Sequence, residues 1–95
     1  KFSDIGYIEY NKERKHWFAI LKEKKIQLKR NISADDILKL SPLFAQINQQ
    51  QIINISHLDT IEGKECKLDS LFKETSKLII SRNYFNTVQD RFLIL

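Results

Sequence analysis

The chain has 95 residues and a mass of 11.3 kDa, which is enough for one small hydrophobic core. Hydrophobic residues make up 42% of it and charged residues 29%, proportions typical of a folded domain rather than a disordered segment. One cysteine and two histidines exclude a disulfide framework within the chain and a dedicated zinc cluster. The longest apolar run covers only residues 17–21, so the sequence predicts no membrane-spanning helix.

The positive charge is concentrated in one segment of the chain. The net charge is +4, but residues 11–30 hold eight basic and two acidic side chains, a local excess of +6, while residues 1–10 and 31–95 each sum to −1. A concentrated basic segment in a folded domain predicts a polyanionic partner, most commonly nucleic acid. The alternative is an edge strand kept soluble by its lysines. Charge alone leaves both interpretations open.

The residue composition favours strands. The chain has fourteen isoleucines and ten aromatic residues but only three alanines. This composition suits pleated sheets better than helices. Strands are predicted over residues 5–10, 16–22 and 25–29, and the last two form a hairpin through a turn at residues 22–24. Apolar side chains occupy both alternating faces of residues 16–22, so we expect this strand to be covered on both sides.

Helical signals occur twice. Ser33 is a good N-cap for a short helix with Asp36 at its third position, and Pro42 ends that helix near residue 40. A second helix is predicted to begin after Ser81 and to be as short as a single turn. The predicted fold is mainly β, because the chain between the two helices has the pattern of short strands, over residues 43–48, 51–55, 58–61, 64–70 and 77–80.

The sequence contains no motif of a known catalytic site. Its two glycines cannot form a glycine-rich phosphate loop. Ser56 and His57 come nearest to a nucleophile and its base, but neighbouring residues of a strand point to opposite faces. Cys66 is expected to be a small buried hydrophobic residue. We therefore expect neither enzymatic activity nor a cofactor.

Three short motifs occur in order along the chain. Residues 4–9 are DIGYIE, residues 44–55 are FAQINQQQIINI and residues 80–85 are ISRNYF. Together they resemble the opening strand, the central signature and the final motif of the LytTR family, the DNA-binding domains that end many bacterial response regulators. The resemblance covers about residues 4–92, nearly the whole chain.

The resemblance implies both a fold and a function. The LytTR fold is mainly β, an elongated stack of small antiparallel β-sheets with short helical segments, and it would occupy residues 1–95 as a single domain excised from a longer regulator. The implied function is sequence-specific binding of double-stranded DNA by loops that enter successive major grooves. The implied setting is the cytoplasm, with an upstream receiver or sensor domain of a two-component system and two copies, which could pair as a homodimer, on a direct-repeat site. No membrane contact by this segment is expected.

The family's base-reading positions carry over to Lys15, Gln49 and Arg82. An arginine can present two donors to guanine O6 and N7, a glutamine can pair with adenine N6 and N7, and a lysine can reach guanine or a phosphate. The remaining basic residues of the segment would add a sequence-independent attraction. Supporting contacts to DNA are expected from the neighbours of these three residues: His16, Asn48, Gln50, Asn83, Lys12 and Arg14.

The central motif departs from the family pattern. Where the family has His-Arg-Ser-Tyr, this chain has Asn48-Gln49-Gln50-Gln51, and the three consecutive glutamines have no evident packing role. We expect an altered base preference rather than a loss of binding, because an uncharged amide can still read adenine.

A function of a different class remains open at this stage. A small β-rich protein–protein interaction or sensory domain, with a basic edge that serves solubility, would have the same composition. The two classes differ in one property: DNA binding weakens steeply with salt.

Overall fold

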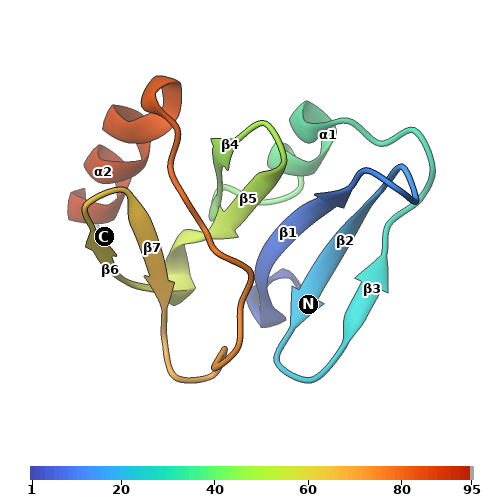
Figure 1. Ribbon diagram of the computed structural model, residues 1–95, viewed down its shortest axis with the longest axis horizontal. Coiled ribbons are helices and arrows are strands. Elements are labelled where there is room, and N and C mark those ends of the chain that lie inside the picture. The colour runs from blue at the N-terminus through green and yellow to red at the C-terminus, as the bar shows by residue number, and fades with distance from the viewer. Residues whose placement is uncertain (95) are drawn as a thin grey trace.

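Figure 1 shows the computed structural model of the chain, which describes residues 1–94. The molecule measures 33 × 27 × 23 Å. Its larger sheet has five antiparallel strands in the spatial order β3-β2-β1-β5-β4, and its smaller sheet pairs β6 with β7. The strands are β1 (Ile5–Asn11), β2 (His16–Leu21), β3 (Lys25–Gln27), β4 (Phe44–Asn48), β5 (Gln51–Asn54), β6 (Leu58–Glu62) and β7 (Glu65–Leu68).

Short helices connect and cover these sheets. The first α-helix begins as expected: the Ser33 hydroxyl accepts from the Asp36 backbone N–H at 3.1 Å, and the Asp36 carboxylate accepts from the Ser33 N–H at 3.0 Å. These two bonds form a capping box. The helical segments are α1 (Ala34–Leu38), α2 (Phe85–Ile94) and the single-turn 3₁₀ helices η1 (Phe2–Asp4), η2 (Ile55–His57) and η3 (Arg82–Tyr84).

The larger sheet separates two hydrophobic cores. Side chains alternate along its strands, and this is why residues 17–21 are apolar at every position: β2 is covered on both faces, as predicted. The core under α1 contains Ile8, Trp17, Ala19, Ile37, Phe44 and Ile52. The core on the other face, under the smaller sheet and α2, contains Tyr7, Ala45, Ile47, Ile53, Ile55, Leu58, Cys66, Leu78, Ile80 and Val88. The predicted mainly β fold of small antiparallel sheets is confirmed.

The predicted strand at residues 77–80 is wrong. Only Ile79 forms a bridge, to Glu65, and the segment instead connects the two sheets. The Ile80 N–H donates to the Lys64 carbonyl oxygen beside the smaller sheet at 2.7 Å, and the Ser81 N–H donates to the Ile47 carbonyl oxygen of β4 at 2.7 Å. The segment pairs with the smaller sheet only at this bridge, because the carbonyl oxygens of Lys77 and Ile79 accept instead from side chains of the larger sheet.

The last helix is longer than predicted. The helix α2 has ten residues, because Val88 is fully buried and half-buried Phe85 and Phe92 pack against the same core. The Arg91 guanidinium fastens it by donating to the carbonyl oxygens of Phe44, at 2.8 Å, and of Pro42. Over residues 1–94, none of the helices is both long enough and apolar enough to cross a membrane.

Candidate nucleic-acid interface

The β1–β2 turn holds basic side chains on a fixed backbone. The Asn11 carbonyl oxygen accepts from the Lys15 N–H at 2.7 Å, and the Asn11 side-chain oxygen accepts from the Arg14 N–H at 2.9 Å. Lys15 has a φ of 58°, in the left-handed region that residues other than glycine rarely adopt. Lys12, Arg14 and Lys15 are all exposed, so the turn presents three cations to solvent.

His16 begins β2 beside this turn and is half-buried. Its Nδ1 lies 2.8 Å from the Arg14 carbonyl oxygen. Because a carbonyl oxygen only accepts, we assign the Nδ1 proton to this bond, and the neutral ring then has Nε2 as an acceptor. The turn backbone thereby fixes the orientation of the imidazole.

The β4–β5 turn is formed by two residues, of which Gln49 is exposed. The Asn48 side chain closes the turn: its oxygen accepts from the Gln50 N–H at 2.8 Å, and its Nδ2 donates to Gln51 Oε1 and to the Ile79 carbonyl oxygen, each at 2.8 Å. The Asn48 amide is therefore used within the chain, and it sets the conformation in which Gln49 projects.

Gln51 has a role that sequence reasoning missed. Its side chain is 8% exposed, and its Nε2 donates to Glu9 Oε2 at 2.6 Å and to the Lys77 carbonyl oxygen at 3.1 Å. The glutamine joins β5, β1 and the connecting segment, and it leaves Gln49 as the one exposed member of the run. A buried glutamine beside a carboxylate 42 positions away leaves no signal in local sequence.

Arg82 and Asn83 follow the segment that connects the sheets. Both are exposed, and they begin η3 directly after Ser81, whose N–H is bonded to Ile47 at the end of β4. A cation at the N-terminal end of a helical segment is electrostatically unfavourable. Arg82 therefore gains nothing from its own helix and is free to meet an external anion or base.

Strand register and the Ser81 bond to Ile47 bring these three segments to one side of the molecule. β1 and β5 are antiparallel, so Glu9 pairs with Gln51 and the Tyr10 N–H donates to the Gln50 carbonyl oxygen at 2.8 Å. The end of β1 therefore lies beside the β4–β5 turn. Figure 1 shows the result along its upper side. We name this region the loop edge and define it as residues 12–15, 49–50 and 81–83.

The structure divides the basic segment between two ends. Lys22 and Lys24 lie in the β2–β3 turn, at the end opposite the loop edge, because β2 runs away from that edge. β3 then returns, and the Leu28 N–H donates to the carbonyl oxygen of Trp17 near the start of β2 at 2.8 Å. Lys29 and Arg30 follow on the side of the loop edge.

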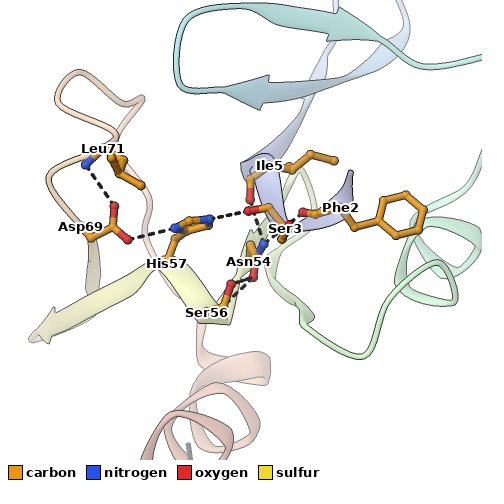
Figure 2. A network of polar contacts seen from close by, with 8 residues as sticks. All are labelled: Phe2, Ser3, Ile5, Asn54, Ser56, His57, Asp69 and Leu71. Carbon is orange, nitrogen blue, oxygen red and sulfur yellow. Dashed lines mark hydrogen bonds and ion pairs between the residues drawn. The ribbon is translucent and has the colours of Figure 1, made fainter.

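A buried polar network lies at the opposite end from the loop edge (Figure 2). Asn54 is 0% exposed; its Nδ2 donates to the carbonyl oxygens of Ile5 at 2.9 Å and Phe2 at 3.3 Å, and its oxygen accepts from the N–H and hydroxyl of Ser56. The Ser56 hydroxyl thus bonds to Asn54. It does not bond to His57, in agreement with the expectation that Ser56 and His57 do not act as a nucleophile and its base.

His57 ties three segments together in the same network (Figure 2). Its Nδ1 lies 2.9 Å from the Asp69 carboxylate and its Nε2 lies 2.7 Å from the Ser3 carbonyl oxygen. Both partners are acceptors, so the geometry suits the doubly protonated ring. Burial lowers the pKa of His57, but the bonds to Ser3 and Asp69 outweigh it, and the pKa is raised above its ordinary value.

Within residues 1–94, the cysteine and the possible metal-binding side chains do not form a reactive or metal-binding site. Cys66 is 3% exposed, and burial raises its pKa to about 11, so the thiol stays protonated at neutral pH. This confirms its predicted place as a buried small residue. Within residues 1–94, no three histidine, cysteine, aspartate or glutamate side chains are grouped so that they could hold a metal ion.

Comparison with known proteins identifies the family. Residues 1–92 match the LytTr DNA-binding domain, and the chain belongs to this family. Among solved structures, the chain is similar to the LytTr DNA-binding domain of a putative methyl-accepting/DNA response regulator from Bacillus cereus, with a TM-score of 0.74 and 18% identity over 99% of this chain and 84% of that one. No curated protein matches the chain.

Proposed function

We propose that the chain is a DNA-binding output domain of a transcription regulator and that it binds double-stranded DNA through the loop edge. The observation that carries this proposal is the meeting of Lys15, Gln49 and Arg82 at one end, each exposed and each next to a backbone fixed by hydrogen bonds. Membership of a DNA-binding family supports the choice of ligand.

The composition of the loop edge favours duplex over single-stranded DNA. Residues 12–15, 49–50 and 81–83 include four basic side chains and one carboxylate, and no aromatic residue. Proteins that bind single strands stack bases on aromatic side chains, whereas amide and guanidinium groups recognise base edges in a groove. The loop edge therefore has the groups needed for groove recognition and lacks the platform for stacking.

The dimensions also suit a duplex. The three loops are spread along the long axis of the molecule in Figure 1, which measures 33 Å. One turn of B-DNA is about 34 Å long. Loops at the two ends of such an edge can enter successive major grooves on one side of the helix.

Each candidate DNA-contacting residue has a proposed role. Arg82 reads guanine through two donors, Gln49 reads adenine, and Lys15 meets guanine or a phosphate. Asn48 acts by holding the turn that carries Gln49. The supporting contacts to the DNA backbone come from Lys12, Arg14, His16, Gln50 and Asn83.

The wider setting follows from the family. We propose a non-enzymatic domain of a longer bacterial two-component regulator, located in the cytoplasm and controlled by a receiver or sensor domain, with two copies on a direct-repeat site. The fold neighbour from Bacillus cereus is described as part of a response regulator, which supports this arrangement.

A salt titration after a random-sequence selection tests the proposal. For the selected duplex, log K should fall by about 0.9 per tenfold rise in salt concentration for each phosphate neutralised. A scrambled duplex should bind more weakly at every salt concentration. If no duplex is enriched and no salt dependence appears, the chain instead serves protein–protein contact or sensing.

A further inference from the structure

An apolar groove lies on the same face of the larger sheet as α1, beyond the part that α1 covers. Ala19 and Leu21 of β2 form its floor, Phe2 and Ile5 form one wall, and Ile26 and Leu28 form the other. The groove has a volume of about 450 Å³. Phe2 is 45% exposed and Ile26 is 41% exposed, although side chains of this size are normally buried. Exposed apolar surface with a polar rim marks interaction sites.

The two edges of the larger sheet differ in how they are covered. At β4, the connecting segment and α2 close the edge, through the Ser81 bond to Ile47 and the Arg91 bonds to the β4 start. At β3, the described chain places no strand on the outer side, and all three residues of β3 are exposed. An open edge is a template for an added strand.

Charge around the groove selects the kind of strand. Residues 22–30 have five basic side chains and one acidic side chain, and the exposed Lys1 also lines the groove. Two copies of this chain would bring like charges together across β3, which opposes pairing of edge with edge. An acidic strand would meet opposite charges.

We propose that the groove and the β3 edge together bind an acidic amphipathic segment of a partner protein, as a strand added beside β3. Alternate apolar side chains of that segment pack against Ile26 and extend the groove wall, and its carboxylates, on the other sheet face, lie toward Lys25. The site faces away from the loop edge, so the partner and DNA bind at the same time.

The test uses the folded domain and a short fluorescein-labelled peptide in which valine and glutamate alternate. The peptide should bind and shift the NMR signals of η1, β2 and β3. Ile26→Glu should weaken binding by about tenfold or more, because it removes an apolar wall and adds a repelling charge. Leu40→Glu is the matched control: the same apolar-to-acidic change at an exposed residue between α1 and β4, away from the β3 edge, should change affinity by no more than about twofold.

Several results would overturn the proposal. They are the absence of peptide binding, equal weakening by Ile26→Glu and Leu40→Glu, equal binding of a peptide with lysine in place of glutamate, and signal shifts at the loop edge instead of β3. A dimer of the domain in sedimentation that Ile26→Glu dissociates would also overturn it, since the occupant would then be a second copy. DNA binding by Ile26→Glu should equal that of the wild type, so failure here is separate from failure of the proposed DNA function.

Discussion

The two ends of the larger sheet use polar side chains in opposite ways. At the loop edge, the turns are fixed by hydrogen bonds of Asn11, Asn48 and Gln51, so that neighbouring polar side chains project into solvent. At the far end, Asn54 and His57 direct every side-chain polar atom toward the protein. The first pattern leaves groups available for a ligand, and the second stabilises the fold.

This comparison separates residues whose loss should unfold the domain from those whose loss should change recognition. Changes at the far end should alter stability and leave base preference intact. Changes at the loop edge should alter binding and leave stability intact.

Asn54→Ala should have the largest effect on stability. The variant loses the four hydrogen bonds of the fully buried Asn54 side chain and leaves the Ile5 carbonyl without its side-chain donor, which costs about 2–4 kcal/mol. Urea denaturation measures the free energy of unfolding. Ser56→Ala, at an exposed neighbour, is the control and should cost less than about 1 kcal/mol. Equal losses from the two variants would contradict the role given to Asn54.

Arg82→Ala should weaken binding to the preferred duplex by about 1–3 kcal/mol and relax preference at one base pair. Unfolding should be unchanged, because the side chain is exposed. Binding to a library of duplexes that differ at single positions measures both effects. Lys24→Ala, at the opposite end, should leave the base preference as it is. A uniform loss over all duplexes from Arg82→Ala would contradict base reading by this residue.

Gln49→Ala should change preference at a different base pair by about 1 kcal/mol, at the low end of the range for a direct base contact, because a neutral amide replaces the family's arginine. The same duplex library measures it. Gln50→Ala is the comparison: because this half-buried side chain is proposed to support the DNA backbone and not to read a base, its loss should lower affinity evenly and leave the base preference unchanged. Unchanged affinity and unchanged preference in Gln49→Ala would remove this residue from the interface.

His57 should give a small pH dependence of stability. Its pKa is raised in the folded state by the bonds to Ser3 and Asp69, against the effect of burial, so the folded protein binds the proton more tightly. The stabilisation is complete below the unfolded pKa of about 6.5 and is lost as the pH rises through the folded value. Urea denaturation across this window measures it, with His57→Gln as the variant that should lack this contribution. A free energy of unfolding that rises with pH across this window in the wild type, but not in His57→Gln, would contradict the raised pKa of His57.

Local patterns predicted much of the fold because they depend on near neighbours. Alternation of apolar residues located β1 and β2, and Ser33 with Asp36 located the start of α1. The segment at 77–80 was wrongly predicted as a strand, because its hydrogen bonds go to both sheets. Burial of Gln51 could not be predicted either, since its partners Glu9 and Lys77 are distant in sequence.

The charge pattern shows the same limit at the level of the site. The sequence located a basic segment at residues 11–30 but could not place its members at opposite ends of a hairpin. Lys15 lies at the loop edge, whereas Lys22 and Lys24 lie at the far end. The candidate reading residues depended on resemblance to a family. Their contact with DNA stays a prediction. Their common location follows from the register of β1 with β5, which sets Lys15 near Gln49, and from the Ser81 bond to Ile47, which sets Arg82 beside β4.

The central claim is that DNA meets the loop edge and not the lysines of the β2–β3 turn. NMR titration of the labelled domain with a selected duplex tests it most directly. The account predicts that backbone signals shift at residues 12–16, 49–50 and 82–83 and stay in place at residues 22–25. Shifts concentrated at residues 22–25, with the loop edge unchanged, would contradict it.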